Sequence, residues 1–83
     1  MVSRTKSNPR YKAVPRMHEI RKEKGIETSK ELAQLANVTE PTISRFDSQT
    51  RYDINVLASV AKALNVKIDD LFIIEENKEA DSN

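Results

Sequence analysis

The feature that most constrains the fold is the run from Thr28 to Phe46, TSKELAQLANVTEPTISRF. Thr28 precedes Glu31 by three residues, which is the spacing of a capping box, where each residue satisfies a backbone N–H of the other. Leucine and alanine then recur at helical spacing up to Ala36, and Asn37 follows directly. Because asparagine tolerates the left-handed conformation that closes a helix, we expect a helix of about two turns that ends at Ala36.

A second helix is predicted directly after this turn. Thr39 is a good N-cap, and Glu40 and Pro41 fall in the first turn, where a carboxylate suits the helix dipole and a missing N–H costs nothing. Ile43 and Phe46 lie three residues apart, which places both on the inward face. The predicted helix over residues 40–46 therefore presents small, polar and cationic side chains to the outside.

Three further helices are expected around this pair. Apolar residues at three-residue spacing predict a helix over about 14–24, closed by Gly25, the single glycine of the chain. A continuous apolar face predicts a long helix over 54–64 that ends at Asn65. A short fifth helix within 66–72 would close the core.

These residues resemble the helix-turn-helix of Cro and phage-repressor regulators, also called the xenobiotic-response-element family. With Ser29 as the first motif position, the family's small residue, turn former and two hydrophobes fall at Ala33, Asn37, Ile43 and Phe46. The resemblance implies an all-α, compact five-helix repressor-like domain. It also implies that the second motif helix lies in the DNA major groove.

The resemblance covers about residues 14–73 and includes IRKEKG at 20–25 and AKALNVKIDDLF at 61–72. In this family an arginine of the first helix often pairs with an acid that follows the recognition helix. The matching residues here are Arg21 and Asp47, so the resemblance implies a structural ion pair between them.

The resemblance also implies which side chains contact DNA. Base contacts are expected from the outward side of the second motif helix, namely Glu40, Pro41, Thr42, Ser44 and Arg45. Phosphate contacts are expected from the motif's helix starts and from the loop after the second helix, namely Ser29, Thr39, Gln49, Thr50, Arg51 and Tyr52. Arg51 is the strongest of these because a guanidinium matches phosphate geometry. Glu40 has two interpretations, since its carboxylate can accept from a cytosine amino group but repels phosphate.

Charge divides the chain into three parts, although the net charge is only +1. We expect a flexible basic arm over 1–13, a helix-turn-helix domain over 14–74 and a disordered acidic tail over 75–83. The arm has two interpretations, either a solvated terminus or a DNA-contacting segment that follows phosphates or enters the minor groove. Its candidate contacts are Arg4, Lys6, Arg10 and Lys12.

Composition excludes several other classes. The 83 residues suit one domain, and the absence of cysteine removes disulfides, thiolate metal ligands and cysteine nucleophiles. His18 is the lone histidine and is expected at the surface or rim, and adjacent Asp69 and Asp70 would splay to different sides of a helix. No nucleophile with a base, ligand cluster or phosphate loop is present in the sequence, so we predict no enzyme, no cofactor and no metal.

We therefore predict a sequence-specific DNA-binding transcriptional regulator, a repressor of phage, mobile-element or bacterial type. Its expected partners are double-stranded DNA and a second copy of itself, at least on DNA, with no membrane and no evident small-molecule effector. No apolar run approaches a membrane span and no hydrophobic signal follows Met1, so the bacterial cytosol or nucleoid is the expected location.

The alternative is a protein-interaction module of the same fold, with antirepressor-like or antitoxin-like partner binding. The near-neutral centre of the chain, Glu40 and the apolar pair Ile73 and Ile74 favour it. These two isoleucines have two interpretations at this point, because they either finish the core or form an exposed patch. Salt dependence separates the two functions, because DNA binding weakens steeply as salt rises.

Overall fold

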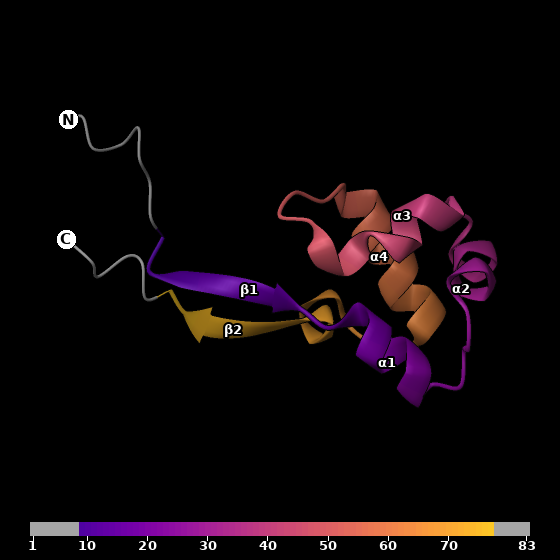
Figure 1. The fold of residues 1–83 in the computed structure, drawn as a ribbon, viewed down its shortest axis with the longest axis horizontal. Helices are drawn as coiled ribbons and strands as arrows, with labels where there is room; N and C mark the ends of the chain where they lie inside the picture. The colour runs from indigo at the N-terminus through magenta and orange to yellow at the C-terminus, as the bar shows by residue number, and fades with distance from the viewer. Residues whose placement is uncertain (1–8, 78–83) are drawn as a thin grey trace.

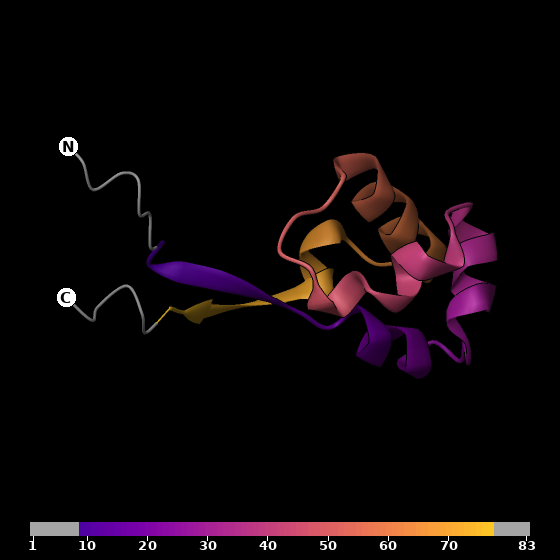
Figure 2. The ribbon, with the colours of Figure 1, turned by 45° about the horizontal axis from the view of Figure 1, so that its top comes forward.

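The computed structural model describes residues 9–77. Within this range the chain forms four α-helices and one two-stranded antiparallel sheet (Figure 1). In chain order the elements are β1 (Tyr11–Pro15), α1 (Met17–Glu23), α2 (Ser29–Ala36), α3 (Glu40–Ser44), α4 (Ile54–Leu64) and β2 (Phe72–Glu76). Two 3₁₀ turns, Phe46–Ser48 and Ile68–Leu71, follow α3 and α4. The helices form one body, and the sheet projects from it in both views (Figures 1 and 2).

The helix starts follow from side-chain caps. The Thr28 hydroxyl accepts from the backbone N–H of Glu31 at 3.1 Å, and the Asp53 carboxylate accepts from Asn55 N at 2.8 Å. The return bond of the predicted capping box differs, because the Glu31 carboxylate accepts from the backbone N–H of Glu27 at 3.2 Å rather than from Thr28. Both helices nevertheless begin where the sequence places them.

The helix ends follow from residues in the left-handed conformation. Asn37 closes α2 at φ 58° and Asn65 closes α4 at φ 61°. Gly25 follows α1 at φ 80°, a value that costs glycine little because it has no Cβ. All three predicted stops are confirmed.

The core lies between the helices, and among residues 9–77 its only buried polar or charged residue is Arg21. Helix α2 packs against both α3 and α4, and the turn Ile68–Leu71 packs against α4. The buried apolar side chains are Met17, Ile20, Leu32, Ala33, Ala36, Ile43, Phe46, Leu57, Val60, Ala61, Leu64 and Leu71. Most of these lie on the apolar helix faces that the sequence predicts.

Strands β1 and β2 form what we call the terminal ribbon. Its register pairs Tyr11 with Glu76, Lys12 with Glu75 and Val14 with Ile73. Residues before a proline favour extended backbone, which places Val14 in a strand and delays the first helix until after Pro15. Backbone hydrogen bonds at the two ends, Arg16 N to Leu71 O at 2.8 Å and Asn77 N to Arg10 O at 2.7 Å, extend the pairing.

The ribbon corrects the expectation of an all-α, five-helix domain. The first helix begins at Met17 rather than Val14, and a 3₁₀ turn followed by β2 takes the place of the fifth helix. The ribbon also takes residues 11–13 from the expected arm and residues 75–76 from the expected tail. Of the remaining arm and tail, residues 9, 10 and 77 are described, and residues 1–8 and 78–83 lie outside the described residues.

Among residues 9–77, no helix is both long and apolar enough to cross a membrane.

Candidate nucleic-acid interface

The unit formed by α2, the Asn37 turn and α3 has its inner face anchored in the core. Ile43 is fully buried and Phe46 is 1% exposed, so both hold the outer helix against the body. The backbone N–H of Val38 donates to Ala33 O at 3.0 Å, which ties the turn to the preceding helix. The predicted helix-turn-helix is therefore present, with Ile43 and Phe46 in the anchoring roles expected of them.

The outer helix is shorter than the expected span of residues 40–46. Helix α3 ends at Ser44, Arg45 lies at its C-cap, and Phe46 begins a 3₁₀ turn. The reason is local, since the Ser48 N–H and hydroxyl both bond to Arg45 O at 3.0 Å and draw the chain into a tighter turn.

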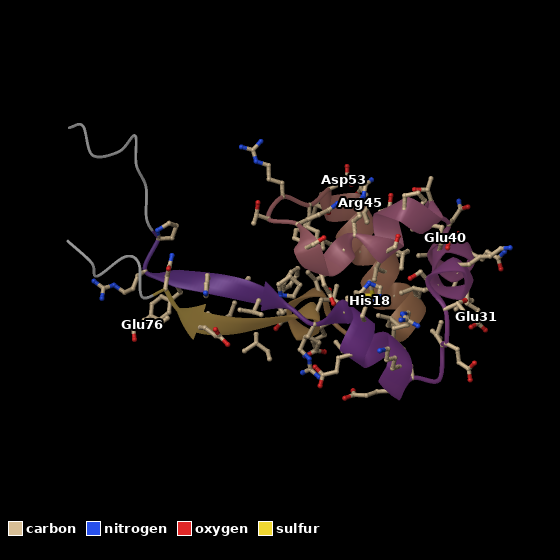
Figure 3. All side chains as sticks on the ribbon, in the orientation of Figure 1. His18, Glu31, Glu40, Arg45, Asp53 and Glu76 are labelled. Carbon is tan, nitrogen blue, oxygen red and sulfur yellow. The ribbon has the colours of Figure 1, made fainter. Side chains whose placement is uncertain are left out.

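The outward side of α3 carries the five residues predicted to contact bases. Glu40, Pro41, Ser44 and Arg45 are exposed, whereas Thr42 is half-buried. Two hydroxyls are engaged locally, because Thr42 Oγ1 lies 2.7 Å from Thr39 Oγ1 and Ser44 Oγ donates to Glu40 O at 3.2 Å. Within residues 9–77 the side chains of Glu40 and Arg45 make no hydrogen bond or ion pair, so their charged groups remain available (Figure 3).

The loop after α3 carries most of the residues predicted to contact phosphates. Thr50 and Arg51 are exposed, and Gln49 is half-buried. The other two candidates are elsewhere: Ser29 is the first residue of α2 and half-buried, and Thr39 is the exposed N-cap of α3. In the described part of the chain the guanidinium of Arg51 has no protein partner, which is the state expected of a group that binds an external anion.

Tyr52 supports this loop instead of extending from it. Its hydroxyl lies within hydrogen-bond distance of Phe46 O and of Gln49 O, the latter at 3.0 Å, and a hydroxyl has one hydrogen to donate. Its ring packs 4.9 Å from that of Phe46 and 5.4 Å from that of Phe72. Burial raises the pKa of the phenol, and the charge of Asp47 raises it further. Tyr52 therefore positions the loop, and its phosphate contact stays a prediction.

A cavity of about 490 Å³ separates β1 from this loop. Lys12 lines it on the ribbon side, and Gln49 and Thr50 line it on the loop side. The ribbon therefore brings one predicted arm residue beside two predicted phosphate contacts, although they lie far apart in the sequence. Arg10 is exposed just before β1, whereas Arg4 and Lys6 lie outside the described residues.

The predicted ion pair between Arg21 and Asp47 is wrong. The Asp47 carboxylate instead accepts from the backbone N–H groups of Met17 and His18, at 3.0 and 3.1 Å, and so caps α1 from across the core. Arg21 donates to His18 Nδ1 at 3.2 Å and to Ile26 O at 2.8 Å. The carboxylate prefers the start of α1 because two unpaired N–H groups and the positive end of the helix dipole meet there.

His18 thus has a role that sequence reasoning missed. It is half-buried, its N–H bonds to Asp47 and its ring accepts from Arg21, so it connects the two residues that were expected to pair directly. The sequence carries no signal for this role, because it predicts the first helix from about residue 14 and so does not place His18 in the first turn. No group of metal-ligating side chains occurs within residues 9–77.

Comparison with known proteins agrees with this geometry. No curated protein and no solved structure matches the chain. A family model described as the Cro/C1-type HTH DNA-binding domain matches residues 16–77, which span the four helices and β2. The chain therefore belongs to the family of Cro/C1-type helix-turn-helix DNA-binding domains.

Proposed function

We propose that this protein is a sequence-specific transcriptional repressor that inserts α3 into the DNA major groove. The observation that carries this proposal is the exposed, polar outer side of a short helix whose inner side is locked in place by Ile43 and Phe46. A rigid support of this kind lets a few side chains address base edges in a fixed register.

Arg45 and Glu40 are the proposed base readers. Arg45 is suited to the two acceptors of a guanine, and Glu40 is suited to the amino group of a cytosine. Pro41, Thr42 and Ser44 complete the helix surface that faces the groove. The hydroxyls of Thr42 and Ser44 already bond to Thr39 and to Glu40 O. We therefore propose that these two residues shape the surface of α3 that faces the groove, and that each hydroxyl can share its hydrogen bonding with the DNA.

The proposed backbone contacts lie on both sides of α3. Ser29 and Thr39 lie at the starts of α2 and α3, and Thr50 and Arg51 lie in the following loop. Lys12 extends this set onto the ribbon because it lines the same cavity as Thr50. These groups would supply affinity and a dependence on salt, but not sequence discrimination.

The protein is further proposed to act as a homodimer on a two-fold symmetric operator. Half-sites would be spaced about one helical turn apart, so that both copies of α3 meet the same side of the duplex. The bacterial cytosol or nucleoid is the proposed site of action.

The test is selection of binding sites from random double-stranded DNA, with sequencing of the bound fraction at two salt concentrations. We expect an enriched two-fold symmetric site that survives the higher salt. Arg45→Ala should reduce discrimination among sequences, whereas Arg51→Ala should weaken binding to all sequences and lower the salt slope by about one unit. Lys62→Ala, which removes one positive charge near the far end of α4, is the matched control and should change neither.

A protein-interaction module remains the second candidate, and the exposure of Ile73 and Ile74 favours it. Failure to enrich any site, together with weak binding that disappears as salt rises, would contradict the repressor and support this candidate.

A further inference from the structure

The cavity between β1 and the loop after α3 has an aromatic wall whose members are far apart in the sequence. Tyr11, Tyr52 and Phe72 all line it. The rings of Tyr52 and Phe72 meet edge to face with 5.4 Å between their centroids, and the Tyr52 hydroxyl is held by loop carbonyls, so this part of the wall is fixed. Tyr11 is 58% exposed, and a ring bound in the cavity would cover it. The wall therefore suits a flat apolar group.

The size of the cavity suits a small molecule. Its volume of about 490 Å³ lies within the range of roughly 300–1,000 Å³ that is typical of ligand pockets. An apolar cavity of about 150 Å³ already holds benzene. This cavity therefore has room for one or two fused rings with a polar substituent.

The open edge of β1 supplies hydrogen-bond donors at the cavity. Arg10 and Arg16, which flank β1, both make backbone hydrogen bonds toward the β2 side. Because such bonds alternate along an antiparallel pair, the even-numbered residues of β1 face β2. The peptide groups of Tyr11 and Ala13 therefore face outward, at the edge where both residues line the cavity. In the described part of the chain, no further strand pairs with their two N–H groups.

Proline makes this edge unsuitable for a further strand. Pro15 occupies the next outward position after Ala13, and Pro9 precedes the strand, and neither has an N–H to donate. Two isolated donors are too few for a strand ladder, but backbone N–H groups bind a carboxylate well. The edge therefore suits a small acceptor group.

The charge at the cavity is positive. Among the described residues that line it, Lys12 carries the only charge. Glu75 lies opposite Lys12 in the ribbon, yet within residues 9–77 no ion pair joins them. Alternation places Lys12 on the other face of the ribbon from Tyr11, and its flexible four-carbon stem can bring the ammonium round the strand edge. An anionic group at this edge would therefore gain a partner.

We propose that this cavity binds a small aromatic carboxylate, that is, a molecule of one or two fused rings with a single carboxylate group. Its ring packs against Tyr11, Tyr52 and Phe72. Its carboxylate accepts from the N–H of Tyr11 or Ala13 and pairs with the ammonium of Lys12. The sequence showed no effector site because the lining residues come from separate segments that only the fold brings together.

The ligand would act on the proposed DNA contacts, and this step rests on the proposed function. Lys12 and Thr50 both line the cavity and both belong to the proposed phosphate contacts. A carboxylate that neutralises Lys12 removes one positive charge from that set. The ligand and DNA therefore compete, and each lowers the affinity of the other by the same factor.

The first experiment titrates the protein with naphthoate in the absence of DNA and follows the backbone amide signals by NMR. Tyr11 and Ala13 should show the largest saturable shifts, because their N–H groups are the proposed donors, whereas amides of α4 should not move. Naphthylmethanol has the rings without the charge, and acetate has the charge without the rings. Each should bind at least about tenfold more weakly than naphthoate. Equal affinity for naphthoate and naphthylmethanol, or no saturable shift at Tyr11 and Ala13, would overturn the proposal.

Variants test the two halves of the site separately. Tyr11→Ala should raise the dissociation constant of naphthoate about tenfold, and Tyr11→Phe, which keeps the ring, should bind as well as wild type. Ile74→Ala is the matched control, because it removes a comparably exposed apolar side chain of the same ribbon that does not line the cavity. Lys12→Gln should weaken naphthoate and leave naphthylmethanol unchanged, whereas Lys62→Gln should change neither. Equal losses in Tyr11→Ala and Ile74→Ala, or in Lys12→Gln and Lys62→Gln, would overturn the site.

The last experiment measures competition with DNA at the selected site. Saturating naphthoate should lower the DNA affinity about fivefold or more and reduce the salt slope by about one unit. Unchanged DNA affinity with the ligand bound would overturn the competition.

Failure of this proposal is distinguishable from failure of the proposed function, because ligand binding is measured without DNA. A protein that binds naphthoate at Tyr11 but enriches no DNA site keeps the cavity site and loses the repressor. A protein that enriches a symmetric DNA site but shows no saturable shift with naphthoate keeps the repressor and loses the cavity site.

Discussion

The helical body buries its large apolar side chains, whereas the terminal ribbon leaves two isoleucines exposed. In the body Met17, Leu32, Ile43 and Leu71 have no exposed surface, whereas in the ribbon Ile73 is 45% and Ile74 66% exposed. Apolar residues therefore have different roles in the two regions. Burial stabilises the body within one chain, whereas the ribbon is maintained by backbone pairing and by its Phe72 anchor.

The largest effect should come from isoleucine truncation in the two regions. Ile43→Ala removes fully buried apolar atoms and should lower the free energy of unfolding by about 2–5 kcal/mol. Ile74→Ala makes the same change at an exposed position and should cost less than about 0.5 kcal/mol in the monomer. Denaturant unfolding of dilute protein measures both free energies. Equal losses in the two variants would contradict the difference between the body and the ribbon.

The next effect concerns the cap that joins the end of the recognition unit to α1. Asp47→Ala leaves the N–H groups of Met17 and His18 without their acceptor and should lower the free energy of unfolding by about 1–2 kcal/mol. Asp69→Ala, an exposed carboxylate outside this contact, is the control and should change stability little. Similar losses in the two variants would show that general charge, rather than the cap, carries the effect.

A smaller effect is expected at Tyr52, which joins the two regions. Tyr52→Phe removes the hydroxyl from Phe46 O and Gln49 O and should cost about 1 kcal/mol at neutral pH. Because the pKa of this phenol is raised on folding, its contribution should be full below about pH 10 and be lost as the pH rises through the folded value.

Unfolding measured between neutral and alkaline pH tests this dependence. Tyr52→Phe should flatten the alkaline fall in stability, whereas Tyr11→Phe, at an exposed ribbon position, should preserve it. An alkaline fall of the same size in both variants would contradict the assignment to Tyr52.

The smallest effect is a difference in local opening. Backbone amides of β2 should exchange with solvent before those of α4, because the ribbon has less buried apolar surface to hold it closed. Hydrogen exchange at low and high protein concentration measures this difference. If the protection of the β2 amides rises with protein concentration, the ribbon takes part in self-association. If the β2 amides exchange as slowly as those of α4 in dilute protein, the predicted difference between the ribbon and the body is wrong.

Much of the helical body could be predicted from the sequence because it depends on local chemistry. Thr28 and Asp53 cap helices, Asn37 and Asn65 end them, and apolar spacing identifies Ile43 and Phe46 as anchors, because all of these depend on neighbours within a few residues. The candidate DNA-contacting side of α3 followed from the same spacing. Its length did not, since the turn at Ser48 shortens it.

The ribbon was missed because its pairing is not local. Tyr11 and Glu76 are partners across almost the whole chain, and neither segment is marked as a strand by its own short sequence. The Arg21–Asp47 pair was predicted wrongly for a related reason. The resemblance suggested Arg21 as the partner of Asp47. In the folded chain the start of α1 lies beside Asp47 and binds its carboxylate instead, and the sequence does not show that these two segments meet.

The sequence by itself determined both limits of α2, the turn at Asn37, and the start and outward residues of α3, since capping and periodicity act between near neighbours. The tertiary structure alone decided that residues 11–15 pair with residues 72–76 in a ribbon, that Asp47 caps α1, and that Lys12 lies beside the loop carrying Thr50. These contacts join residues distant in the chain, and their free energy depends on how the whole core closes.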